Sequence, residues 1–332
     1  MSYAEEFKRV IFGFAKDVER YLSCDKANYV YKAARTEESG TFDANYGNRS
    51  RLCWALEYDV CEVPNKFELV RELFLEELKD RETNSFQGIG ENLETLTSLL
   101  LQLGEPKDSE LFTRAKNANF DCNCGYEPHV IKAEPFEKLP RRYCIETLFE
   151  LGEEELAIKL TDEFKSEAAT YEDLKDILFI SKTALHRESD REFAVTGIYR
   201  LYQSTPGRFE GFDAVSAVRD YAEMLVEKGD IAAALAVWNE NKETLKRFER
   251  GFYLLGAKLT AGGAEAPEKI WEDILPYIKE DMTRNMVAPI YRDVMLSAAE
   301  LSRDRAMLKK LKRYFKKRES ELRKVFEDKE KK

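Results

Sequence analysis

The residues with the clearest metal-ligand chemistry lie between positions 122 and 144. Cys122, Cys124, His129 and Cys144 follow the pattern C-x-C-x4-H-x14-C, which offers three thiolates and one imidazole to a zinc ion. Structural zinc sites usually use a C-x2-C knuckle, and the shorter spacing here requires a tighter turn. Zinc binding is therefore one interpretation. The sequence favours the other, in which Cys144 is buried on a helix and the loop cysteines are free thiols. No other cofactor is expected.

Catalytic motifs are scarce. Nucleophilic catalysis through a Ser-His-Asp or Cys-His arrangement requires a histidine, and the chain has only His129 and His186. Neither a phosphate loop nor a dinucleotide-binding glycine motif is present. Carboxylate pairs such as Glu76-Glu77 are so frequent that none of them indicates a general acid. We therefore expect a noncatalytic protein, with a metal-dependent enzyme centred on residues 119–139 as a lesser alternative.

Two stretches interrupt the helical pattern, at residues 36–50 and 119–139, and both contain glycine together with aromatic residues. We expect each to be a long loop that folds back on the body of the protein. Arginine and aromatic side chains beside such loops are typical anchors at protein interfaces, although Trp54 is more simply a core residue. The predicted partner-binding residues are Tyr46, Arg49, Arg51, Tyr126, Arg141 and Arg142.

Charge is distributed unevenly along the 332 residues. Lys and Arg number 53 against 63 Asp and Glu, which gives a formal net charge of -10. Residues 303–332 alone carry +8, so the remainder carries -18. An acidic body favours a basic partner and repels phosphate. The segment predicted to bind a nucleic acid, if the protein binds one, is therefore Arg303–Lys332. Six dilute cysteines and the absence of an apolar run of membrane-spanning length indicate a cytoplasmic protein.

Apolar residues recur with the period of an α-helix along most of the chain. The segments 212–226 and 231–245 each have an apolar face, and only a Gly229-Asp230 turn separates them, which predicts an antiparallel helical hairpin. Helix, glycine and helix follow one another again around Gly104 and Gly152. Ser189 with Glu192, and Thr170 with Asp173, have the spacing of a capping box at a helix start.

The segment YAEMLVEKGDIAAALAVW, residues 221–238, resembles the core of a tetratricopeptide-type repeat. Ala222 matches a small residue of the first helix, and Ala234 and Trp238 match the small and aromatic packing positions of the second. The segment around Gly152 matches in its turn and in Ala157 only. The resemblance implies stacked helical hairpins that hold a peptide or protein in a concave groove.

Together these observations predict an all-α fold, a right-handed superhelical stack of antiparallel helical hairpins. We divide it into an irregular helical lobe at 1–135, a repeat-like stack at 136–302 and a basic capping helix at 303–332. The predicted function is a protein-binding scaffold or regulator, of which a toxin-neutralising (immunity-type) partner is one version. The alternative is a helical-repeat protein that binds nucleic acid through the basic C-terminal helix. The sequence leaves the oligomeric state open.

Overall fold

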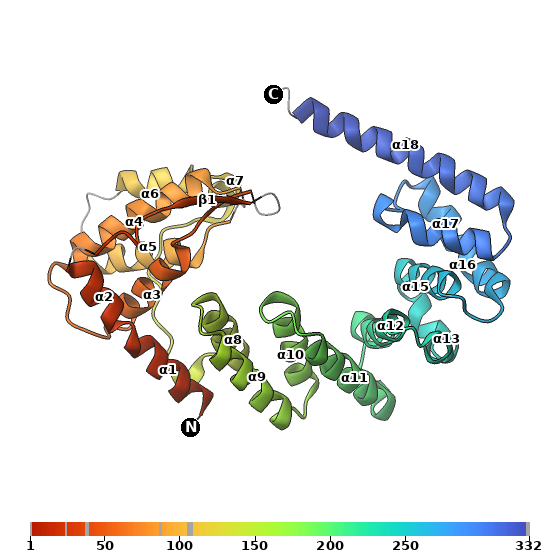
Figure 1. Cartoon of the computed structure of the whole chain (residues 1–332), viewed down its shortest axis with the longest axis horizontal. Helices are drawn as coiled ribbons and strands as arrows, with labels where there is room; N and C mark the ends of the chain where they lie inside the picture. The colour runs from red at the N-terminus through yellow and green to blue at the C-terminus, as the bar shows by residue number, and fades with distance from the viewer. Residues whose placement is uncertain (1, 24, 37–39, 86–87, 105–108, 330–332) are drawn as a thin grey trace. The chain divides into compact units, whose positions relative to one another are not determined.

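The computed structural model describes residues 2–23, 25–36, 40–85, 88–104 and 109–329 and is predominantly helical (Figure 1). It contains two compact units. Unit 1 is Met1–Ser166 together with Lys182–His186, and unit 2 is Glu167–Ser181 together with Arg187–Lys332. The predominance of helix confirms the prediction of a mainly α-helical protein. The right-handed superhelical arrangement of the helices stays a prediction. The predicted division at residues 135 and 302 also stays a prediction.

Unit 1 contains the first half of the helices and a short hairpin of strands. Its helices are α1 (Tyr3–Gly13), α2 (Ala15–Leu22), α3 (Tyr46–Glu57), α4 (Lys66–Thr83), α5 (Glu91–Leu103), α6 (Ser109–Lys116), α7 (Phe120–Gly125), the 3-10 turn η2 (Phe136–Lys138), α8 (Arg141–Glu150) and α9 (Glu154–Glu167). Helix α5 packs on α3 and α4, and α1 packs on α3 and α8. These contacts place α3 at the centre of the unit.

The predicted loop at 36–50 is wrong where the chain is described, because residues 36 and 40–43 belong to strands and residues 46–50 to the start of a helix. Residues 37–39 of that prediction lie outside the described residues. Strands β1 (Ala33–Thr36) and β2 (Gly40–Asp43) pair antiparallel, with Ala33 opposite Asp43. The carboxylate of Asp43 accepts hydrogen bonds from the backbone N–H groups of Lys32 and Asn45, at 2.8 and 2.9 Å. These bonds fix the chain where it leaves β2, and α3 begins immediately afterwards.

The predicted loop at 119–139 is partly helical. Asn119 accepts a hydrogen bond from the Cys122 N–H at 2.8 Å, and this cap starts α7. The irregular segment beyond α7 lies against α5, as expected for a loop that folds back. There the hydroxyl of Ser98 accepts a hydrogen bond from the Ile131 N–H at 2.8 Å and donates one to the Ile131 carbonyl at 2.9 Å.

Unit 2 is built from successive helices that pack on their neighbours. They are α10 (Tyr171–Thr183), α11 (Glu188–Ser204), η3 (Pro206–Arg208), α12 (Gly211–Glu227), α13 (Ile231–Glu240), α14 (Lys242–Lys246), α15 (Glu249–Ala261), α16 (Pro267–Thr283), η4 (Pro289–Tyr291), α17 (Arg292–Leu301) and α18 (Arg305–Lys329). The predicted hairpin of α12 and α13 is confirmed, with Gly229 in the left-handed region at φ +79°. The ring of Trp238 stacks on Phe252 at 5.2 Å inside the core of this unit.

Two of the predicted helix starts have different outcomes. Thr170 and Asp173 form the expected reciprocal cap, because the Asp173 N–H donates to the Thr170 hydroxyl and the Thr170 N–H donates to the Asp173 carboxylate. Ser189 is not a cap, since α11 already begins at Glu188. Its neighbour Asp190 is buried and forms an ion pair with Arg187 at 3.3 Å, which fixes the first turn instead.

Candidate functional site

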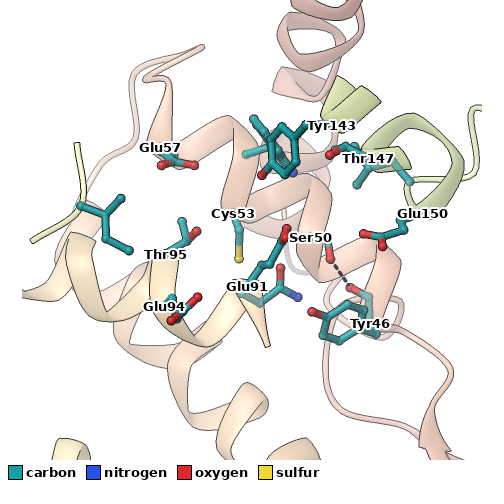
Figure 2. Close-up of a pocket in the computed structure, with 14 residues that line it drawn as sticks. Tyr46, Ser50, Cys53, Glu57, Glu91, Glu94, Thr95, Tyr143, Thr147 and Glu150 are labelled. Carbon is teal, nitrogen blue, oxygen red and sulfur yellow. Dashed lines mark hydrogen bonds between the residues drawn. The ribbon is translucent and has the colours of Figure 1, made fainter. Parts of the chain in front are cut away.

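A cavity of about 200 Å³ opens in unit 1 between α3, α5 and α8 (Figure 2). Glutamates and aromatic side chains dominate its wall. The lining residues are Tyr46, Ser50, Cys53, Trp54, Glu57, Glu91, Asn92, Glu94, Thr95, Ile131, Tyr143, Thr147, Glu150 and Leu151. We call this cavity the acidic pocket.

Helical periodicity explains why α3 contributes so much of the wall. Tyr46, Ser50, Cys53 and Glu57 are spaced by four, three and four residues, which places them along one face of the helix. Leu52 and Ala55, which lie on the side of α3 turned away from that face, are buried. Burial of that side fixes the rotation of the helix, so the polar face is held toward the cavity.

Two other helices present polar stripes of the same kind. On α8, Tyr143, Thr147 and Glu150 follow one another at intervals of four and three residues. On α5, Glu91 and Glu94 lie in the first turn. Figure 2 shows carboxylates from all three helices around the cavity. The site therefore combines residues that are more than one hundred positions apart in the chain.

None of the side-chain carboxylates of the four pocket glutamates forms a hydrogen bond or ion pair with another described residue. Burial, followed by repulsion from Glu91, raises the pKa of Glu57 to about 7. Burial, followed by repulsion from Glu91 and Glu146, raises the pKa of Glu150 to about 6. Glu150 and Glu91 also reach solvent at the mouth, whereas Glu57 is half-buried, so desolvation acts most strongly on Glu57.

Two of these carboxylates lie where a helix disfavours negative charge. Glu57 is the last residue of α3, and Glu150 is the last residue of α8. The backbone dipole places partial negative charge at the C-terminal end of a helix, so an anion there is destabilised and a cation is favoured. Burial, neighbouring carboxylates and helix dipoles therefore act in the same direction at both positions.

The other polar groups of the pocket are neutral at physiological pH. Burial, and then the charge of Glu77, raises the pKa of the Cys53 thiol well above its ordinary value, so Cys53 is not a thiolate nucleophile. Burial likewise raises the pKa of the Tyr46 and Tyr143 hydroxyls. The ring of Tyr143 lies 6.1 Å from that of Trp54. The cavity thus combines aromatic faces with carboxylates that lack a counter-ion.

A buried ionic network connects two of the helices that form the pocket. The guanidinium of Arg49 is fully buried, and it pairs with Asp43 of β2 and with Glu77 of α4, the latter at 2.9 Å. The Asn92 amide of α5 also donates to Glu77, at 3.5 Å. Although burial opposes its charge, the carboxylates of Glu77 and Asp43 raise the pKa of Arg49. This network joins α3, α4, α5 and β2, and it keeps the pocket-forming faces of α3 and α5 together.

The residues predicted to bind a partner are only partly brought together. Tyr46 lines the acidic pocket, but Arg49 and Tyr126 are buried, and Tyr126 shares a hydrogen bond of 2.8 Å with the Thr97 hydroxyl. These two side chains therefore have structural roles in this conformation.

The three other predicted arginines are engaged within unit 1. The Arg51 guanidinium donates to the Leu151 carbonyl at the C-terminal end of α8. Arg141 packs over the Phe164 ring at 4.8 Å, and Arg142 forms an ion pair with Glu146 at 3.5 Å. None of the three lines the acidic pocket.

The predicted zinc ligands do not converge. No group of three or more Cys, His, Asp or Glu side chains suited to a metal occurs among the described residues. Cys122 and Cys144 are buried, whereas Cys124 is exposed. The Nδ1 atom of His129 lies 2.7 Å from the carbonyl oxygen of Glu127. Cys122 and Cys124 are both free thiols, and Cys144 is buried on α8, as the other interpretation of these cysteines expects.

The glutamates of the acidic pocket were missed because carboxylates are abundant everywhere in the sequence. The signal that could have found them is the placement of Tyr, Ser or Thr and Glu along one face of α3 and again along one face of α8. Comparisons with known proteins add no family to this chain: no family model matches it, and neither a curated protein nor a solved structure does. None of the described helices combines the length and apolar character needed to cross a bilayer.

Proposed function

We propose that unit 1 is a protein-binding module whose acidic pocket receives a lysine or arginine side chain of a partner. One observation carries the proposal: four glutamates surround an aromatic-lined cavity, and no cation among the described residues pairs with any of them. Carboxylates held close together without a counter-ion destabilise the free protein, and a bound cation relieves their repulsion.

The size of the pocket supports a side chain over a free metabolite. Pockets for small-molecule ligands generally have volumes of about 300–1,000 Å³. The acidic pocket measures about 200 Å³, which exceeds the roughly 150 Å³ that suffices for a benzene molecule. A guanidinium or ammonium group with the end of its aliphatic chain fits such a volume.

The lining has the chemistry that an alkyl cation requires. Cations are attracted to the faces of aromatic rings, which Tyr46, Trp54 and Tyr143 supply. Unit 1 also carries the excess negative charge of the protein, with 33 Asp and Glu against 23 Lys and Arg, whereas unit 2 has 30 of each. That excess would speed the approach of a basic partner.

A toxin-neutralising role is one version of this proposal, and a metal-dependent enzyme receives no support from the pocket.

The proposal is tested with blocked Gly-Lys-Gly and Gly-Arg-Gly peptides as probes, measured by calorimetry on the full chain. We expect weak, saturable binding that strengthens between pH 5 and pH 8, because Glu57 and Glu150 lose their protons in this interval. Glu57→Gln/Glu91→Gln should abolish binding. Glu110→Gln/Glu137→Gln is the matched control, since it removes the same charge from exposed sites outside the pocket. Equal weakening by both variants would show that only the overall charge matters.

The physiological partner is sought by affinity capture from native extract treated with nuclease. A partner that is retained by the wild-type protein and the control variant, but lost with the pocket variant, supports the proposal. Retention of the same partners by all three proteins would exclude the acidic pocket as their binding site.

A further inference from the structure

Helix α18 carries the largest uncompensated positive charge in the described part of the chain. Between Arg305 and Arg318 there are eight Lys or Arg and no Asp or Glu. Five of the eight line a hollow of about 390 Å³ on the outer side of the helix together with Leu308, and all five are exposed. We call these five cations the basic stripe: Arg305, Lys309, Lys312, Arg313 and Lys316.

Packing fixes the direction in which the stripe faces. Met307, Leu311 and Phe315 of α18 are buried in the core of unit 2, and the Tyr314 hydroxyl donates to the Val287 carbonyl at 3.1 Å. At 3.6 residues per turn, the five cations occupy an arc of about 100° away from this buried edge. The helix therefore cannot rotate its charges inward without losing its apolar contacts.

The stripe brings five cations together without an acidic partner. Elsewhere some cations pair with an acid one turn away, as Lys79 does with Glu76 at 2.6 Å and Lys246 with Glu243 at 2.8 Å. No member of the stripe forms an ion pair with a described residue. Like charges one turn apart, such as Arg305 and Lys309, destabilise a helix. An anionic ligand would remove that repulsion.

We propose that the basic stripe binds the phosphate backbone of double-stranded nucleic acid. Eleven residues separate Arg305 from Lys316, so the stripe is about 16 Å long, which matches about five phosphates of one strand at 3.4 Å each. Single-stranded nucleic acid is bound largely by stacking on aromatic rings, and the stripe contains none. Contacts to phosphate alone carry no base specificity.

A membrane surface fits the helix less well. Helices that lie in a lipid interface insert an apolar face, and the apolar edge of α18 is already buried against its own unit. Binding to anionic lipid is therefore an outcome that the experiment must distinguish.

The test measures binding of the full-length protein to a 20-base-pair DNA duplex by fluorescence anisotropy between 50 and 200 mM salt. Five phosphate contacts predict a slope of log K against log salt of about -4.5, from about 0.9 per contact. Lys309→Gln/Lys312→Gln removes two contacts, which should reduce the slope to about -2.7. Lys269→Gln/Lys279→Gln on α16 is the matched control, because both lysines are exposed and outside the stripe.

A reduced slope for the stripe variant, with an unchanged slope for the control, supports the proposal. No binding by the wild-type protein at 50 mM salt overturns it, as does an equal change in both variants. Binding to vesicles with 30% phosphatidylserine is measured in parallel, to separate nucleic acid from an anionic membrane surface. If they bind the wild-type protein as tightly as the duplex does, and the stripe variant loses both, the stripe recognises anionic surfaces in general and the assignment to nucleic acid is overturned.

Discussion

Replacement of Glu57 by glutamine should stabilise unit 1 at alkaline pH. Burial and the charge of Glu91 raise the pKa of Glu57 from 4.5 to about 7 in the folded protein. The folded state therefore binds the proton more tightly than the unfolded state, and the free energy of unfolding falls as pH rises from about 4.5 to 7. At about 1.4 kcal/mol per pKa unit, the loss at pH 8 is at most about 3.5 kcal/mol. Water that reaches this half-buried side chain reduces the figure, so we expect about 1–2 kcal/mol.

Hydrogen exchange measured by mass spectrometry on peptides from α3 tests this prediction, because it reports on unit 1 without requiring the two units to unfold together. Glu57→Gln should slow exchange relative to the wild-type protein at pH 8, and the difference should disappear near pH 5. Glu110→Gln, an exposed change on α6, should alter neither. Faster exchange in Glu57→Gln at pH 8, or a difference that is independent of pH, would refute the reasoning from desolvation.

Two further substitutions probe the charges around the acidic pocket. Glu91→Gln should lower the pKa of both Glu57 and Glu150, because repulsion from Glu91 contributes to raising the pKa of each. An NMR titration that follows the carboxyl chemical shifts checks this prediction. An unchanged pKa at both sites would contradict it. Arg49→Ala leaves Asp43 buried without a cation and Glu77 with only Arg81, at 3.5 Å. It should therefore cost about 3 kcal/mol, the lower end of the range for a broken buried pair, visible as an earlier transition in urea. A loss below about 1 kcal/mol would mean that the network contributes little.

The helices were predictable because their signal is local. Burial of one face requires an apolar residue about once per turn, and a glycine with positive φ between two such segments allows the chain to reverse, as at Gly229. The hairpin of β1 and β2 escaped prediction because its pairing depends on a distant residue. The backbone N–H of Thr41 donates to the Ser85 hydroxyl, and the Ser85 N–H donates to the Thr41 carbonyl, both at 2.8 Å. No pattern within residues 36–50 contains that contact.

The acidic pocket could not be predicted for a different reason. Each polar stripe is visible in the sequence, but three helices must pack before Glu57, Glu91 and Glu150 surround one cavity. Their raised pKa values arise from that packing, because desolvation and mutual repulsion appear only when the side chains are enclosed together. A count of carboxylates in the sequence measures neither effect.

Compensation of charge distinguishes the buried network around Arg49 from the two proposed binding surfaces. Arg49 lies in the interior with two carboxylates around it, and such a network joins helices without needing a ligand. The acidic pocket and the basic stripe have opposite signs, yet both hold like charges together without counter-ions among the described residues. Departures of this kind from local electrostatic rules are expected at functional sites. The two surfaces should also respond oppositely to neutralisation, since removing Glu57 weakens only the binding of cations and removing Lys309 weakens only the binding of anions.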